Sequence, residues 1–393
     1  MPSDPITKEE TVVKNDNLNP DKEEAIMDDS TEVKTDMPQT SPDTQTPAQT
    51  NAQASPAPVY DSPYAMTASD QYLLNGILEQ DIDCFSQSSH RLTGYKNLDT
   101  LQPFNNGLYV LGAIPGGGKT TFSAQLAYQA ATIGQHYILY FSLEQTPLEI
   151  FSKFLSRESY LRWAKNNCTS STYTSMDIRC KKVDPSMLNA LKHKCYEDIQ
   201  DRIHIFQGRF GGTVEDIIQE VEKFIEYVNS NDVIVFIDYL QIISASVING
   251  KLLDTRSSMD HIVRSLKILQ QNLAIPIVLI SSLNRASYSS PLSSESFKES
   301  GGIEYTADVI WGLQYDIVHK PEFYHHYENG VRKKETNSKE KRDMMIAAKS
   351  ANVRALNITY LKNRFGIDGL SVSFQYVPAY DCFFPVNEKG FLI

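Results

Sequence analysis

The stretch that decides the fold runs from residue 112 to residue 121 and reads Gly112-Ala113-Ile114-Pro115-Gly116-Gly117-Gly118-Lys119-Thr120-Thr121. An apolar run precedes it at 108–111 and an amphipathic segment follows it at 122–130, so we predict strand, glycine-rich loop and helix in that order. Successive glycines let backbone N–H groups approach phosphates closely, and the start of a helix is positively polarised. The pattern predicts a triphosphate site; the alternative is a glycine-rich turn beside an incidental lysine.

Each residue of this loop has an expected role at bound ATP. Lys119 reaches the β- and γ-phosphate oxygens, and the Thr120 hydroxyl is a ligand for Mg²⁺. The residues expected to hold the nucleotide are Pro115, Gly116, Gly117, Gly118, Lys119, Thr120 and Thr121. The loop departs once from the G-x-x-x-x-G-K-S/T pattern, because Ala113 stands where the first glycine is expected.

Composition limits the class of protein. The chain has 393 residues, of which 41% are hydrophobic, and no apolar run reaches the ~18 residues that a membrane span needs. Residues 1–50 are polar and acidic and lack the apolar stretch of a secretory signal. Its five cysteines form no C-x-x-C pair. We therefore expect a cytoplasmic protein without a membrane partner, a zinc site or a disulfide framework.

The net charge of −11 looks wrong for a protein that binds nucleic acid until it is located along the chain. Residues 1–59 hold 4 Lys and 12 Asp or Glu, while the remaining 334 residues carry 33 basic and 36 acidic side chains. The part expected to fold is therefore close to neutral. A local basic lining can still attract phosphates, because binding depends on the local field.

The first 91 residues are expected to lie outside the main domain. Residues 1–60 have no aromatic residue before Tyr60, so we predict a disordered acidic tail, with a docking segment for a partner as the alternative. Apolar residues at helical spacing within 67–85 predict a linker helix in residues 61–91. This helix packs either on its own domain or on a neighbouring subunit.

From residue 92 onward, segments typical of strands alternate with segments typical of helices. We therefore predict an α/β fold for residues 92–393, with a mainly parallel central sheet flanked by helices. The expected strands are 137–143, 202–207, 233–237, 275–281, 308–313, 355–360 and 370–376, and the expected helices are 148–163, 185–201, 213–228 and 259–273. Residues 319–342 are highly charged and are expected to form a mobile insertion.

Two acidic residues follow predicted strands. Glu144 ends the segment 140–144, and Asp238 follows the apolar segment 233–237. Because ligands bind at the carboxyl ends of parallel strands, we expect both carboxylates beside the phosphate loop. Glu144 is suited to orient and deprotonate the water that attacks the γ-phosphate, and Asp238 is suited to hold Mg²⁺. The alternative for Glu144 is a charge at a helix N-terminus, before Pro147.

Two later segments carry polar groups that a core does not require. Residues 280–285 follow a strand and end in Arg285, a segment suited to sense the state of the nucleotide. Residues 298–304 combine Lys298 with flexible glycines, which suits contacts with a phosphodiester backbone; an ordinary surface turn is equally compatible.

Lys362 and Arg364 form a third such group. They lie two residues apart between the predicted strands 355–360 and 370–376, and on a strand two such residues would share a face. Two cations that project together suit an arginine-finger role at the ATP of an adjacent subunit. The alternative is a solvated basic patch.

Together these motifs resemble the C-terminal ATPase domain of bacterial replicative DNA helicases, the DnaB-like group within the RecA fold. The resemblance covers roughly residues 92–376 and is closest to the shorter relatives common in Gram-positive bacteria and their mobile elements. Seven blocks carry it in the family's order: Leu92-Thr93-Gly94-Tyr95 with Leu98-Asp99, the phosphate loop, Phe141-Ser142-Leu143-Glu144, Ile237-Asp238-Tyr239-Leu240-Gln241, Leu283-Asn284-Arg285, Lys298-Glu299-Ser300-Gly301 and Lys362-Asn363-Arg364.

The resemblance implies a RecA-like P-loop NTPase core that assembles as a ring hexamer, with ATP and Mg²⁺ at the subunit interfaces. The residues that one subunit would supply are Lys119, Thr120, Glu144 and Asp238, and those from the next subunit are Lys362 and Arg364. Single-stranded DNA is the implied nucleic-acid partner, and its expected contacts are Lys298, Glu299, Gly301 and Arg285. Primase or a helicase loader is the implied protein partner.

The chain departs from the family pattern in two respects. Ser282 stands where the family usually has glutamine, and no sequence typical of the family's helical N-terminal domain is found. The leading hypothesis is an ATP-dependent DNA helicase or translocase that acts on single strands in replication. The alternatives are a RecA/RadA-like recombination ATPase and an ATP-switched DNA-binding or loading protein without processive unwinding.

Overall fold

The computed structural model describes residues 73, 76–88, 91–208, 212–244, 247–248, 251–297, 301–328 and 330–386. The predicted tail lies outside these residues. Of the predicted linker helix the structure describes residues 73 and 76–88, which include α2 (Ile77–Ser88). None of the described helices is both long enough and apolar enough to cross a membrane.

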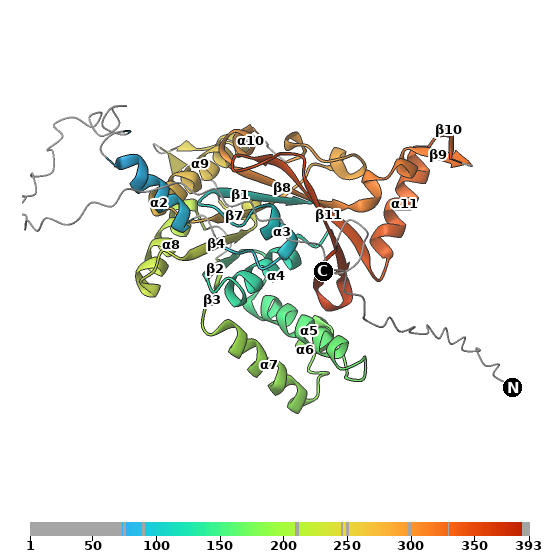
Figure 1. Ribbon diagram of the computed structural model, residues 1–393, viewed down its shortest axis with the longest axis horizontal. Helices are drawn as coiled ribbons and strands as arrows, with labels where there is room; N and C mark the ends of the chain where they lie inside the picture. The colour runs from blue at the N-terminus through green and yellow to red at the C-terminus, as the bar shows by residue number, and fades with distance from the viewer. Residues whose placement is uncertain are drawn as a thin grey trace, which may run out of the picture. The chain divides into compact units, whose positions relative to one another are not determined.

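Nine strands form one sheet, in the order β13-β12-β11-β8-β1-β7-β4-β2-β3 (Figure 1). Six are parallel, namely β1 (Leu108–Ala113), β2 (Tyr137–Ser142), β3 (Ile203–Gln207), β4 (Val233–Asp238), β7 (Ile277–Ser282) and β8 (Val309–Tyr315). Three are antiparallel, namely β11 (Arg354–Asn363), β12 (Ser371–Val377) and β13 (Cys382–Val386). The predicted α/β fold with a mainly parallel sheet is confirmed.

Helices flank the sheet on both sides, with α9 and α10 above β1 and β8 and α5 below β2 in Figure 1. They are α3 (Lys96–Leu101), α4 (Lys119–Thr132), α5 (Pro147–Lys165), α6 (Ser175–Arg179), α7 (Pro185–Ile199), α8 (Val214–Val228), α9 (Thr255–Leu273) and α10 (Gly301–Thr306). Because both faces are covered, β1 and β4 are buried along their whole lengths. Thr213 caps α8 and forms a capping box with Asp216, as the sequence predicts.

The expectation of a mobile insertion at 319–342 is wrong. The segment forms a hairpin, β9 (His325–Glu328) and β10 (Val331–Glu335), followed by α11 (Ser338–Ser350). The prediction of mobility rested on the high charge of the segment. Its elements are largely exposed, but the helix is capped and the two strands pair with each other. Asn337 and Glu340 form a capping box at α11, and Glu340 also pairs with His326 at 3.0 Å. Sequence reasoning also missed β13 and the small hairpin β5 (Val247–Ile248) and β6 (Lys251–Leu252).

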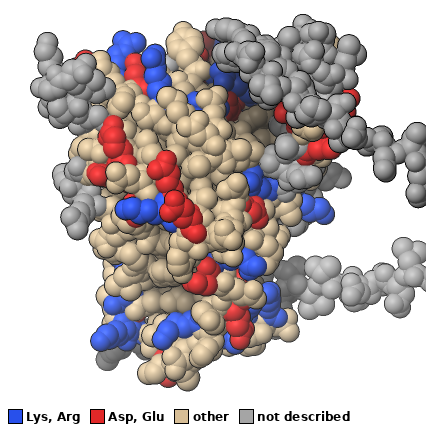
Figure 2. Space-filling view, turned by 90° about the vertical axis from the view of Figure 1, so that its left-hand side faces the viewer, with Lys and Arg blue, Asp and Glu red and all other residues tan. Residues whose placement is uncertain are grey.

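The face of the molecule on the left of Figure 1 carries interspersed basic and acidic side chains over its visible part (Figure 2). This mixture agrees with the near balance of 33 basic and 36 acidic side chains counted outside residues 1–59.

Asp308 links three elements at the amino edge of the parallel strands. Its buried carboxylate accepts the Leu108 N–H at 2.8 Å, and it pairs with Lys267 of α9 at 2.6 Å and with Arg364 at 3.0 Å. Breaking a buried ion pair by removing one partner leaves the other charge uncompensated. Asp308 is therefore expected to matter more to stability than any surface ion pair.

We expect Asp308→Ala to lower the free energy of unfolding by about 3 kcal/mol, because it leaves the Lys267 ammonium without its ion-pair partner and the Leu108 N–H without an acceptor. Urea unfolding measures this. The control is Glu335→Ala, which removes an exposed pair with Arg332 and should change stability by less than about 0.5 kcal/mol. Equal effects of the two substitutions would contradict the greater contribution of Asp308 to stability.

Candidate nucleotide site

The phosphate loop leaves β1 and enters α4, as predicted. Gly116 and Gly118 have φ angles of +75° and +88°, a region that side chains rarely adopt. The N–H of Gly117 donates to the Ile114 carbonyl oxygen over 2.9 Å. Gly117 therefore shapes the turn, and the expectation that successive glycines offer their N–H groups to phosphate does not hold for it in this arrangement.

The loop rests on two aromatic rings from the C-terminal strands. Tyr376 and Phe383 stack with their centroids 4.1 Å apart. A Cβ on Gly118 would lie 2.9 Å from Phe383 Cζ and 3.1 Å from Tyr376 Cε1. Gly118 is therefore required both for its backbone angle and for this close approach, a packing constraint that the sequence did not reveal.

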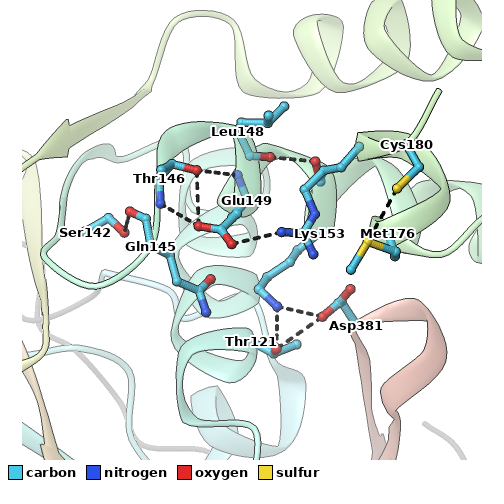
Figure 3. A network of polar contacts seen from close by, with 12 residues as sticks. Thr121, Ser142, Gln145, Thr146, Leu148, Glu149, Lys153, Met176, Cys180 and Asp381 are labelled. Carbon is cyan, nitrogen blue, oxygen red and sulfur yellow. Dashed lines mark hydrogen bonds and ion pairs between the residues drawn. The ribbon is translucent and has the colours of Figure 1, made fainter.

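A buried polar cluster anchors the start of α4 (Figure 3). Lys153 of α5 pairs with Asp381 at 2.8 Å, and the Thr121 hydroxyl contacts both, donating to Asp381 Oδ1 at 3.3 Å and accepting from Lys153 Nζ at 3.3 Å. Because the Thr121 hydroxyl is committed to this cluster, its backbone is the part that remains for a nucleotide. Asp381 has a φ of +50° in the turn between β12 and β13, which gave no signal in the sequence.

Lys119 points along the carboxyl edge of the sheet toward β4. Its ammonium lies 3.7 Å from the centroid of the Tyr239 ring, a cation–π contact. Tyr239 directly follows Asp238, so this contact brings the lysine of the loop to the end of the strand that carries the predicted Mg²⁺ ligand.

Asp238 is buried, with 1% of its surface exposed. Burial raises the pKa of its carboxyl group, opposed by a hydrogen bond from Thr120 and the charge of Lys119 and reinforced by the charge of Glu144. The Tyr140 hydroxyl donates to Oδ2 at 3.3 Å, while Oδ1 has no hydrogen-bond partner among the described residues. A buried carboxylate oxygen without a partner, beside a threonine hydroxyl, fits a site for Mg²⁺ with its waters.

Glu144 lies in the turn between β2 and α5, and it is exposed. The cap of α5 comes instead from Thr146, which forms a capping box with Glu149 (Figure 3). Glu144 makes no hydrogen bond or ion pair with the described residues, but its charge acts on Asp238. Glu144 therefore does not cap α5, but it lies three residues before the first residue of that helix, so its catalytic role and the alternative of a charge at the helix N-terminus both stay predictions.

Lys362 and Arg364 are not brought to this site. Asn363 pairs with Val309 and Tyr109 pairs with Val309, so the end of β11 lies level with the start of β1. Tyr109 and Ala113 are four positions apart, which is roughly 13 Å of strand, and the phosphate loop begins after Ala113. Both cations therefore lie at the opposite edge of the sheet from the loop of their own subunit.

Comparison with known proteins places the chain in a family. The sequence profile described as DnaB-like helicase C terminal domain matches residues 92–379. The chain belongs to this family. Its sequence is similar to the replicative DNA helicase DnaB of Buchnera aphidicola subsp. Schizaphis graminum, with 28% identity over 245 residues, 59% of this chain and 47% of that protein. The DnaB of Haemophilus influenzae is 30% identical over 237 residues, 58% of this chain and 46% of that protein.

The chain thus spans about half the length of the curated DnaB relatives that it matches. Among solved structures, that of a DnaB-like replicative helicase and its interactions with primase aligns with a TM-score of 0.58 at 20% identity, over 80% of this chain and 66% of that one. At this identity the likeness supports the RecA-like ATPase fold alone.

A glutamine from another segment contacts the end of β7, where Ser282 replaces the glutamine usual in the family. Ser282 pairs with Ala113 in the sheet, so it lies beside the start of the phosphate loop. Gln241, from the 3-10 turn Leu240–Ile242, donates to Ser281 Oγ at 2.9 Å and accepts the Ser282 N–H at 3.3 Å. A glutamine amide thus contacts the end of β7 from the turn that follows β4. Gln241 is the last residue of the family block 237–241, and the sequence pattern alone does not predict this contact.

The predicted DNA contacts are placed only in part. Lys298 and Glu299 lie outside the described residues. Gly301 is the first residue of α10, and Arg285 is the first residue of a 3-10 turn, Arg285–Ser289. The two described positions follow the carboxyl end of β7 in the chain.

The raised pKa of Asp238 predicts that its ionised carboxylate lowers the free energy of unfolding. Burial raises the pKa of the Asp238 carboxyl group above its ordinary value, so folding disfavours the ionised form and the free energy of unfolding falls as pH rises through the folded pKa. Asp238→Asn should therefore unfold at higher urea than the wild type near pH 8. The gain should shrink as pH falls toward about 4, because both side chains are then neutral.

Asp232→Asn is the matched control with the opposite sign. Burial acts to raise the pKa of Asp232, but His136 and Arg91 outweigh it and the pKa is lowered. Ionised Asp232 therefore contributes stability near neutral pH, and its amide variant should unfold at lower urea there. If Asp238→Asn also lost stability near pH 8, the prediction that ionised Asp238 destabilises the fold would be contradicted.

Proposed function

We propose that this protein is an ATP-dependent DNA helicase or translocase that acts on single-stranded DNA in replication, assembled as a homo-hexamer with ATP at its subunit interfaces. One observation carries the proposal: the groups suited to hold and activate ATP lie at one edge of the sheet, and the paired cations lie at the other. A subunit built this way completes its site only with the opposite edge of a neighbour.

In the proposed mechanism, the phosphate loop and Lys119 hold the triphosphate, and exposed Glu144 orients the attacking water and accepts its proton. Thr120 and Asp238 would hold Mg²⁺, which neutralises charge on the β- and γ-phosphate oxygens. Lys362 and Arg364 of the next subunit stabilise the charge that develops as the γ-phosphoryl group leaves.

The paired cations contact α10, which supports a link to DNA. Lys362 Nζ donates to the Glu304 carbonyl oxygen at 2.6 Å, and Arg364 donates to the Tyr305 carbonyl oxygen at 3.0 Å. Both carbonyls lie in the last turn of α10, where cations are favoured. The helix begins at Gly301, within the predicted DNA loop. A shift of that loop would move the acceptors of both cations, which would couple DNA at one subunit to ATP at its neighbour.

For the rest of the chain, we propose that residues 1–60 are an acidic tail, 61–91 a linker helix and 92–393 the ATPase domain. Primase or a helicase loader is the proposed protein partner. Family membership favours a helicase over a RecA/RadA-like filament ATPase. An ATP-switched loading protein remains the competing outcome of the following test.

Strand displacement separates the two functions. With ATP and a forked duplex, the wild type should release the labelled strand, and single-stranded DNA should increase ATP hydrolysis at least several-fold. Lys119→Ala should abolish both activities, because the lysine contacts the β- and γ-phosphates. Hydrolysis that responds to single-stranded DNA without any strand displacement would favour the switch.

A further inference from the structure

The helix that sequence reasoning overlooked reaches the phosphate loop. Lys349 lies in the last turn of α11, and its Nζ is 3.5 Å from the carbonyl oxygen of Pro115. A Cβ built on Gly116 would lie 3.1 Å from both Cε and Nζ of Lys349. Pro115 and Gly116 are exposed, so the ammonium lies on the open rim of the loop.

The helix that carries this lysine is held in place. α11 packs on β8, β11 and the 3-10 turn Asp316–His319, with Met345 and Ala348 against the core. At its first turn, the Lys341 ammonium lies 4.9 Å from the centroid of the Tyr324 ring. Lys349 therefore extends from a helix that is packed against the sheet.

The contacts of Lys349 point to an anion. It forms no ion pair with the described residues, and its hydrogen-bond acceptor is a neutral carbonyl at the upper limit of hydrogen-bond distance. A lysine that only neutralised the end of α11 would turn to the carbonyls of that helix. Lys349 instead crosses to a segment 234 residues away. A phosphate oxygen at the loop would offer it a charged acceptor, which forms a roughly twofold stronger hydrogen bond.

We propose that Lys349 is a second phosphate-binding cation of the nucleotide site, supplied by the same subunit as the phosphate loop. The proposal rests on the proposed nucleotide site and adds to it a residue outside the motif. It differs from the roles of Lys362 and Arg364, because Lys349 needs no neighbouring subunit and binds before assembly.

The test compares Lys349→Ala with Lys339→Ala, an exposed lysine in the first turn of the same helix. A fluorescent ATP analogue reports Kd, and tripolyphosphate, which lacks base and ribose, reports phosphate contacts by displacing it. We expect Lys349→Ala to weaken both ligands about tenfold, the loss of one charge-assisted hydrogen bond. Lys339→Ala should leave both unchanged, and Lys349→Arg should retain most of the affinity.

The other outcomes are separable. If Lys349→Ala binds both ligands as the wild type does while Lys119→Ala binds neither, the role of Lys349 is refuted and the nucleotide site stands. If Lys349→Ala loses affinity for the analogue but keeps that for tripolyphosphate, it contacts base or ribose, and the proposal is also refuted. If Lys119→Ala keeps full affinity, the proposed nucleotide site itself fails.

Discussion

The direction of β11 decides what a single subunit can do. Parallel strands end at one edge of the sheet, which gathers the phosphate loop, Asp238 and Ser282 there. β11 runs the other way, so Lys362 and Arg364 at its end lie at the opposite edge. The fold thus places the groups proposed to bind ATP and the cations proposed to act on its transition state at opposite edges of the sheet. In the proposed assembly, a second copy set edge to edge brings these groups together.

The antiparallel strands also support the phosphate loop. Tyr376 and Phe383 pack under Gly118, and the β12–β13 turn supplies Asp381 to the cluster with Lys153 and Thr121. Beyond them, β11 and β8 provide the surface on which α11 rests. Strands β11, β12 and β13 therefore link the shape of the phosphate loop to the strand that carries the paired cations, so displacement of one is expected to affect the other.

Much of this architecture was accessible from the sequence, because local patterns determined it. Apolar runs such as 233–237 and the capping pair Thr213 and Asp216 gave the right elements, and the motif order gave the right family. What failed depended on contacts between distant segments. The 319–342 segment looked mobile because charge was read without its partners, and no spacing rule links Lys349 to Pro115 across 234 residues. The contacts of Asp381 with Lys153 and Thr121 could not be predicted for the same reason.

The most direct test of a shared site is to mix two inactive variants. Lys119→Ala removes the lysine of the loop, and Arg364→Ala removes the cation proposed to act on the neighbour. In mixed assemblies, some interfaces pair an intact loop with an intact Arg364, so ATP hydrolysis in the presence of single-stranded DNA should return to a substantial fraction of the wild-type rate. Mixtures that stay as inactive as either variant alone, although mixed oligomers form, would contradict the account.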